Sequence, residues 1–500
     1  MKSNLKNSVY GTLGFIFSLA ITLITAPYIV HKLTPEIYGI YILFTSLMGL
    51  MSFMDLGFGQ GIIKFVSEYE AKKDYESIKD VIGVSSYIYL IMGIIGAIII
   101  FTFADKLVVL FKVKENYKDL ARYVFQLTAV GFFINFLASI FSPISMALQR
   151  YDISTKAQTT IWLFLNLSIV TLLYLGYGLK EIAIASLCFG IIRLVVYFLI
   201  FRRMLPGILP RPTFKYKVFK KVFSFSVFTA INGITGNLVL KIDKMIISSF
   251  LGTTAVTYYT IPFIMIQMGF GLVGGATQFI FPAVASNLSS LDLKEKLKGI
   301  YRKATKYAVV ISLIFTTGFL ILGGNLLTLW MGADFARNAE KLIPIIAVVF
   351  FFQTVSFPAI HIYNGLGFSK INMISSLVGS SAYLLTALLF IPKFELTGAA
   401  LSFAFTLLPF PLYFYYLHRI LETGNRDFCA LLLKALSIMG IVCTIFFIFG
   451  KAVNIQPSII SLISKGILVI ILSLGIMFIS KLINKDEILV IFNKIRKNII

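Results

Sequence analysis

Seven charged side chains fall inside long apolar stretches of the sequence. They are five cations and two carboxylates: Lys64, Arg193, Lys241, Lys244, Lys465, Asp55 and Asp243. A charge at the centre of a bilayer costs at least about 2.5–3.5 kcal/mol, so charges in such places mark ligand paths or ion pairs. The excess of cations favours an anionic cargo.

Three of these charges have alternative interpretations that the sequence leaves open. Arg193 lies near the middle of its apolar stretch and can face a bound anion or pair with Asp55, another deep charge. Asp55 can instead cap a helix or bind a coupling ion, because a carboxylate in a low-dielectric environment can carry a proton. Lys64 precedes Glu68 by one helical turn, so an i,i+4 ion pair competes with a binding role.

A second charged group consists of Lys241, Asp243 and Lys244. Lys241 and Lys244 are three residues apart and share a helical face, whereas we expect Asp243 to point elsewhere. The group can bind an anion or form gating ion pairs.

The elements that position these charges are apolar helices. The 500 residues are 58% hydrophobic and 13% charged, and the mean hydropathy is +0.89. Apolar stretches long enough to cross a hydrocarbon layer of about 30 Å as helices cover residues 9–31, 38–66, 81–104, 122–148, 157–177, 182–202, 222–250, 254–284, 304–324, 341–365, 370–391, 397–418, 428–450 and 457–480. The sequence therefore predicts an all-α polytopic membrane protein with about 14 transmembrane helices. The three cysteines indicate neither a disulfide framework nor a metal site.

The basic residues between these stretches are distributed unevenly. If the N-terminus is cytoplasmic, 29 Lys and Arg residues lie in inside segments and 11 in outside segments. Basic loops stay in the cytoplasm, so we expect a multi-pass protein with both termini cytoplasmic. This asymmetry accounts for most of the net charge of +23 without nucleic acid as a partner, since the charges are scattered and form no domain.

The sequence repeats itself at an offset of about 218 residues, which aligns Leu33 with Leu251 and Gly57 with Gly275. The match pairs the first six stretches with the next six in the same orientation, which predicts two parallel six-helix repeats plus a C-terminal helix pair. Parallel repeats of transporters bind substrate between the halves and alternate access. The predicted parts are an N-terminal lobe (1–204), a cytoplasmic linker (205–221), a C-terminal lobe (222–421), an added helix pair (428–480) and a basic cytoplasmic tail (481–500).

Residues that weaken helices occur at matching places of the repeats. Pro27, Gly57, Gly59 and Gly275 are therefore hinge candidates. Close packing of small residues between membrane helices explains the glycines equally well.

Several local motifs resemble the polysaccharide flippases. The first half contains Pro27-Tyr-Ile-Val-His-Lys-Leu33, Tyr38-Gly39 and Asp55-Leu-Gly57-Phe-Gly59, and the second contains Phe223-Ser-Phe-Ser226, Lys241-Ile-Asp243-Lys244 and Leu251-Gly252. The chain is similar to the Wzx-type members of the superfamily that also holds the lipid II flippase and the multidrug and toxic compound extruders. The resemblance extends over essentially the whole chain, although many polysaccharide flippases have twelve spans.

The resemblance implies a transporter. Its members translocate undecaprenyl-pyrophosphate-linked oligosaccharide repeat units across the cytoplasmic (inner) membrane by alternating access, for surface polysaccharides such as O-antigen. It implies the lipid-linked glycan and membrane lipids as partners, a polysaccharide polymerase as a further one, and no cofactor besides a coupling proton or sodium ion. The implied site residues are cations for the pyrophosphate (Arg193, Lys64, Lys241, Lys244, Arg150), coupling or gating carboxylates (Asp55, Asp243) and a cation beside a lipid-tail groove of the added helix pair (Lys465). For Arg150 an ordinary cytoplasmic anchor is an alternative, and the Lys465 side chain can instead extend outward to the membrane surface.

Other functions compete with this interpretation. A multidrug extruder and a lipid II flippase belong to the same superfamily, but an extruder cavity should be acidic or aromatic, whereas cations prevail here. A polyprenyl-dependent membrane enzyme is disfavoured because the sequence has no sizeable outer loop for catalytic carboxylates.

Overall fold

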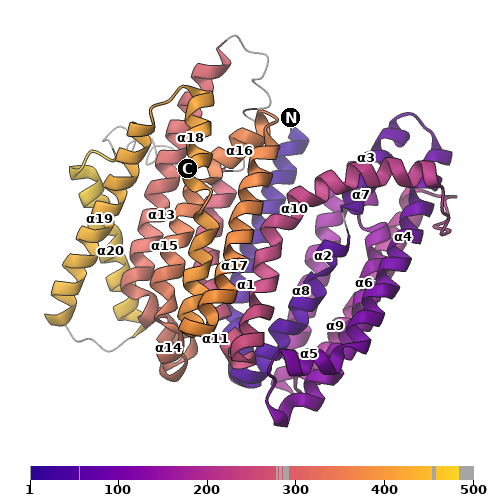
Figure 1. The fold of residues 1–500 in the computed structure, drawn as a ribbon, viewed down its shortest axis with the longest axis horizontal. Helices are drawn as coiled ribbons and strands as arrows, with labels where there is room; N and C mark the ends of the chain where they lie inside the picture. Colours follow the sequence, from indigo (N-terminus) through magenta and orange to yellow (C-terminus); the bar gives the residue numbers. More distant parts are fainter. Residues whose placement is uncertain are drawn as a thin grey trace. The chain divides into compact units, whose positions relative to one another are not determined.

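The computed structural model describes residues 2–55, 57–277, 280, 284, 292–452 and 458–483, and every regular element among them is a helix (Figure 1). The chain divides into two compact units. The first consists of Met1–Thr257 and Ala387–Glu395, and the second of Tyr258–Thr386 and Leu396–Ile500. The lobe boundaries that we expect from the repeat remain a prediction.

The first unit contains the helices from α1 to α10. They are α1 (Lys2–Gly49), α2 (Met51–Met54), α3 (Phe58–Ala71), α4 (Tyr75–Thr102), α5 (Ala104–Leu110), η1 (Glu115–Tyr117), α6 (Lys118–Phe141), α7 (Ile144–Ala147), α8 (Tyr151–Tyr174), α9 (Leu179–Met204) and α10 (Tyr216–Leu251). We call the end where α3 and α9 finish and α4 and α10 begin the linker end; α5 lies at the opposite end (Figure 1).

The second unit contains the remaining helices, and α11 crosses the boundary between the units. These helices are α11 (Thr253–Thr277), α13 (Leu293–Met331), α14 (Ala333–Ala339), α15 (Leu342–Val355), α16 (Phe357–Gly365), α17 (Ser369–Ala404), η2 (Phe405–Leu407), α18 (Phe410–Leu421), α19 (Asn425–Ala452) and α20 (Ile459–Ile479). The predicted tail lies outside the described residues from position 484 onward.

Apolar side chains cover much of the helices' outer faces. Ten segments of the described residues are long and apolar enough to cross a membrane. Exposed isoleucines and leucines follow one another along α4, α9 and α20, as expected for helices that contact lipid tails. The predicted all-helical membrane architecture is confirmed, while the count of about fourteen spans remains a prediction.

The helices begin and bend where the local sequence requires it. Asp74 caps α4 by accepting a hydrogen bond from the Ser77 amide at 3.0 Å. Within α1, Thr34 has φ 68° and ψ 153°, so a sharp kink before Pro35 divides this helix into two. A second break lies between α2 and α3, where Gly57 takes φ 73° as the residue before α3, a conformation that glycine adopts without steric cost.

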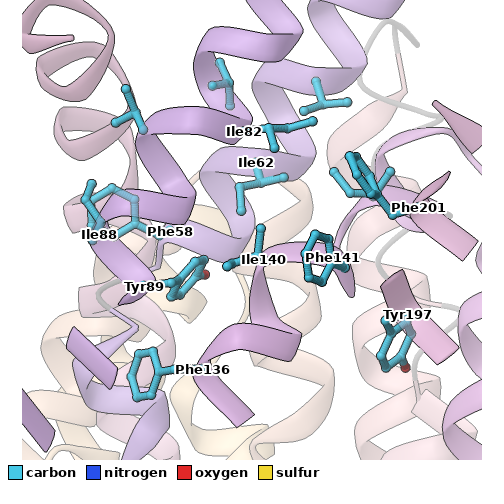
Figure 2. Packing of buried hydrophobic residues seen from close by; sticks show 14 of the residues in the cluster. Phe58, Ile62, Ile82, Ile88, Tyr89, Phe136, Ile140, Phe141, Tyr197 and Phe201 are labelled. Atoms are coloured by element: carbon cyan, nitrogen blue, oxygen red, sulfur yellow. The ribbon is translucent and has the colours of Figure 1, made fainter. Parts of the chain in front are cut away.

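Aromatic residues pack among the aliphatic residues in the core of each unit. In the first unit Tyr89 is buried between Phe58 and Phe136, with ring centroids 6.4 and 5.9 Å away (Figure 2). In the second unit the Tyr363 hydroxyl donates to the Tyr413 carbonyl at 2.8 Å. The Tyr89 hydroxyl also donates a hydrogen bond to Asp55, which lies at the break before α3.

Candidate anion-binding site

Two lysines meet aromatic rings at the linker end of the first unit. Lys64 on α3 places its Nζ atom 4.0 Å from the centroid of Phe225 and 5.0 Å from that of Phe65. Lys221 on α10 places its Nζ 5.0 Å from the centroids of Phe65 and Tyr69, and it donates a hydrogen bond to the Tyr69 hydroxyl at 2.8 Å. Because α3 and α10 pack together, residues more than 150 positions apart form one cluster.

The two ammonium groups are available to a ligand. Both lysines are exposed, and neither has a carboxylate of the described residues within ion-pair distance, although the Glu68 carboxylate is close enough to attract both. Since each Nζ lies 5.0 Å from the Phe65 centroid, the two nitrogens are at most about 10 Å apart. Aromatic faces hold ammonium groups in place with a weak attraction, and lysines bind phosphates as point charges. The pair can therefore hold a multiply charged anion.

The expected partner of Lys64 is engaged elsewhere. Glu68 forms an ion pair with Lys72 at 2.8 Å, so the alternative of an ion pair between Lys64 and Glu68 is wrong. Both lysines are four residues from Glu68, but a glutamate that precedes its lysine forms the better helical pair, and Lys64 instead contacts the rings of Phe65 and Phe225.

Asp55 lies at the break between α2 and α3. Its carboxylate accepts a hydrogen bond from the Tyr89 hydroxyl and further ones from the backbone amides of Gly57 and Gly59. This geometry is that of a cap on α3, one of the alternatives for this residue. Its role as a coupling-ion site remains a prediction.

Arg193 lies on the face of α9 that packs into the first unit. It is half-buried, and the turn before it approaches α6, where a Cβ atom at Gly190 would lie 3.9 Å from the Asn135 side-chain oxygen. No carboxylate of the described residues lies within ion-pair distance of Arg193, so the alternative of a pair with Asp55 is not formed. A role in anion binding remains a prediction.

The other predicted cations are placed differently. Arg150 is exposed and forms a bidentate ion pair with Asp152, at 3.0 and 3.1 Å. Lys244 pairs with its neighbour Asp243 at 3.0 Å, and Asp243 is only 1% exposed. Our expectation that Asp243 points away from this group is therefore wrong, because the lysine folds back over the buried carboxylate. The Lys241 side chain lies outside the described residues.

The hinge and groove candidates also have clear locations. Gly57 and Gly59 flank the break before α3, whereas Pro27 lies inside α1, seven residues before the kink, and Gly275 lies inside α11. A pocket of about 230 Å³ between α13 and α20 is lined by Gly318, Gly466 and apolar side chains. Lys465 is adjacent to this lining in the sequence. Hinge and groove functions remain predictions.

A buried carboxylate that the sequence did not single out lies at the opposite end of the first unit. Glu36, 6% exposed, follows the Thr34 kink and accepts hydrogen bonds from the hydroxyls of Thr253 and Thr254. Lys114 forms an ion pair with it at 2.8 Å. Burial raises the pKa of Glu36, but the hydrogen bonds from Lys114 and both threonines outweigh burial and leave its pKa below the ordinary value.

The backbone segments on the two sides of this contact also approach each other closely. A Cβ atom at Gly39 would lie 2.0 Å from the Thr253 carbonyl oxygen, and the Thr257 hydroxyl donates to the Pro35 carbonyl at 2.6 Å. The sequence repeat could have indicated this contact, because the offset of 218 residues aligns Glu36 with its partner Thr254. No comparable sequence pattern predicts that Lys221 lies beside Lys64.

Known proteins share both the sequence pattern and the fold. The family model described as a polysaccharide biosynthesis protein matches residues 32–340. A Shigella flexneri protein described as a candidate O-antigen transporter is 23% identical over 406 residues, which are 80% of this chain and 94% of that protein. The lipid II flippase MurJ, in an inward closed conformation, has a TM-score of 0.73 and 14% identity, and the match covers 96% of this chain and 100% of that one. An inward-facing multidrug resistance MATE family transporter of the MOP superfamily has a TM-score of 0.68 and 14% identity, with 82% and 94% covered.

Proposed function

We propose that this chain, which belongs to the polysaccharide biosynthesis protein family, translocates an undecaprenyl-pyrophosphate-linked oligosaccharide repeat unit across the cytoplasmic membrane. The solved structures that its fold resembles are those of transporters and flippases. Translocation proceeds by alternating access, and the glycan then reaches a polysaccharide polymerase on the outer side. A pyrophosphate and a polar glycan must cross a layer that excludes both, so the protein has to supply cations and hydrogen-bonding groups on the way.

The observation that carries this proposal is the Lys64–Lys221 pair. Two ammonium groups that form no ion pair with the described residues, each 5.0 Å from the Phe65 centroid, suit the two phosphates of a pyrophosphate. An organic cation, the cargo of a multidrug extruder, would be repelled by them.

The orientation of the chain completes the proposal. With both termini in the cytoplasm, as the basic loops favour, the linker end lies on the cytoplasmic side. Lys64 and Lys221 then meet the pyrophosphate on the side where the lipid-linked unit is made. The apolar pocket between α13 and α20 suits part of the polyprenyl tail, with Lys465 nearby as a cation for the head group.

The experiment is a deletion of the gene in its host, followed by measurement of two quantities. Surface polysaccharide should be lost, and glycan linked to lipid pyrophosphate should accumulate inside the cell. Normal polymer together with new sensitivity to cationic drugs would refute the proposal and favour an extruder. Accumulation of lipid II with arrest of cell-wall synthesis would assign the protein to lipid II instead.

Complementation of the deletion strain tests the two lysines. The double variant Lys64→Ala/Lys221→Ala should reduce polymer at least tenfold at equal protein levels, because two phosphate contacts are lost. The matched control is Lys220→Ala, since Lys220 is adjacent on α10 and also exposed. Full polymer in the double variant would exclude this pair as the pyrophosphate site.

A further inference from the structure

An apolar pocket of about 380 Å³ opens on the first unit between α4, α6, α9 and the linker that follows α9. Its walls include Leu90 of α4 and Phe198 of α9, and two linker prolines, Pro210 and Pro212, close one end. Ser86 is the sole polar side chain among the described residues that line it. Its volume lies within the range of about 300–1,000 Å³ that is typical of small-molecule pockets.

The surface around this pocket contacts lipid. Ile94 lies one turn beyond Leu90 on the same face of α4, and Ile191 lies two turns before Phe198 on the same face of α9. Val130 occupies the corresponding place on α6, and all three side chains are exposed. A hydrated path for a glycan would present polar groups here, so this face belongs to the lipid boundary.

The linker is fixed over one end of the pocket. The Thr213 amide donates a hydrogen bond to the Gly83 carbonyl of α4 at 3.1 Å, and Lys215 pairs with Asp80 at 2.6 Å. A Cβ atom at Gly83 would lie 2.3 Å from the Thr213 hydroxyl oxygen and 3.1 Å from the Arg211 carbonyl oxygen. Glycine at position 83 therefore permits the linker to approach α4 this closely.

Two arginines are close in sequence to residues that line this end of the pocket. Arg211 lies between the two lining prolines, and Arg202 lies one turn beyond Phe198 on the same face of α9. Both side chains are exposed, and in the described part of the chain neither has a carboxylate within ion-pair distance. Two exposed arginines thus lie next to lining residues at one end of the apolar pocket, one in the linker and one on α9.

We propose that this pocket binds one acyl chain of an anionic membrane phospholipid, whose phosphate is held by Arg202 and Arg211. Basic pockets between membrane helices bind anionic head groups, and a guanidinium holds phosphate oxygens bidentately. The bound lipid stabilises the linker between α9 and α10 against α4. A phospholipid is the occupant because the pocket opens on the lipid boundary, where phospholipids are in large excess. The proposal is independent of the cargo that the protein transports.

The test measures lipid binding by the purified full-length protein. Native mass spectrometry in a neutral detergent compares phosphatidylglycerol with phosphatidylcholine of the same acyl chains. We expect phosphatidylglycerol to bind more tightly, and Arg202→Gln and Arg211→Gln each to weaken it about fivefold, the contribution of one basic side chain near a membrane surface. Arg203→Gln is the matched control, because Arg203 is exposed beside Arg202 but lies on another face of α9.

A second variant tests the apolar part of the pocket. Leu194→Trp, at a lining position, should fill the pocket and lower the binding of both lipids. Because overpacking can prevent folding, the exposed arginine variants decide the result if this variant does not yield monodisperse protein. Equal binding of the two lipids to the unsubstituted chain, or unchanged phosphatidylglycerol binding in Arg202→Gln/Arg211→Gln, would overturn the proposal. Displacement of phosphatidylglycerol by an equimolar polyprenyl phosphate would overturn it as well and assign the pocket to the cargo.

Discussion

Replacing Glu36 with glutamine should loosen the contact between the Thr34 kink and the start of α11. The carboxylate accepts hydrogen bonds from Thr253 and Thr254 and an ion pair from Lys114. Glutamine keeps the shape but loses the charge, and its amide nitrogen can accept nothing from a threonine hydroxyl.

The magnitude follows from the exposure of each partner. A hydrogen bond to a charged group contributes about 1.5–3 kcal/mol, whereas the Lys114 side chain is 68% exposed and its ion pair contributes less than about 1 kcal/mol. Since glutamine retains one hydroxyl contact, we expect the closed contact to lose about 2 kcal/mol. That loss corresponds to about a thirtyfold increase in the open population.

Hydrogen–deuterium exchange of the purified protein measures this opening. Amides of residues 33–40 and 250–257 should exchange about thirtyfold faster in Glu36→Gln, while the core of α6 stays unchanged. Glu115→Gln is the matched control, because Glu115 is 83% exposed and pairs with Lys118 three residues on. Exchange within twofold of the unsubstituted chain would refute the reasoning.

The same contact should respond to pH in a defined direction. The pKa of Glu36 lies below its ordinary value of 4.5 in the folded chain, so the ionised carboxylate is favoured by the closed contact. Its stabilising contribution is present above pH 4.5 and is lost as the pH falls through the lowered pKa. Protection of residues 250–257 against exchange, relative to the intrinsic rate at each pH, should therefore decrease below that pKa in the unsubstituted chain and stay constant in Glu36→Gln.

Three further predictions test the roles assigned to Gly39, Asp55 and Arg193. Gly39→Ala should lower the thermal stability more than Gly318→Ala, because a Cβ atom meets the Thr253 carbonyl at the first position and open space at the second; equal melting temperatures would contradict the packing at Gly39. Asp55→Asn should preserve glycan transport if Asp55 only caps α3, and a loss of transport with normal expression would support a coupling role. Arg193→Ala should reduce polymer in the complementation assay at least tenfold, whereas Arg150→Ala should leave it near normal, because Arg150 is exposed and engaged by Asp152; the reverse order would exclude Arg193 from the transport path.

The fold was predictable because membrane helices leave a strong signal in the sequence. Every backbone group in lipid must be paired internally, so long apolar stretches can only be helices. The interruptions were less predictable. Gly57 was visible as a helix-weakening residue, and the gap between the stretches 9–31 and 38–66 contains the kink at Thr34. The residue at which the chain kinks was not predictable, because Pro27 was the hinge candidate in this region.

Side-chain partners were predictable only where they are local and have one solution. Lys64 and Lys72 both have Glu68 at i,i+4 spacing, but the order Glu68–Lys72 is the more favourable one, and Lys64 packs against Phe225. The predicted linker of residues 205–221 includes Lys221. The contact of this lysine with α3 was not predictable, because α3 lies more than 150 residues earlier in the chain. Such contacts arise from tertiary packing, which local propensities do not specify.

The Glu36 contact has a property that links it to the internal repeat. The offset of 218 residues aligns Glu36 with Thr254, which is one of the residues it binds. Each segment of the contact is thus the repeat equivalent of the other, and both the Glu36 carboxylate and the Thr257–Pro35 hydrogen bond join them. If the repeats move against each other during transport, their equivalent segments must separate at this end, and the hydrogen bonds to Glu36 must break. If the closed contact in Glu36→Gln is less stable by about 2 kcal/mol, this end should open faster and transport should continue. A substitution that keeps the contact closed should abolish transport.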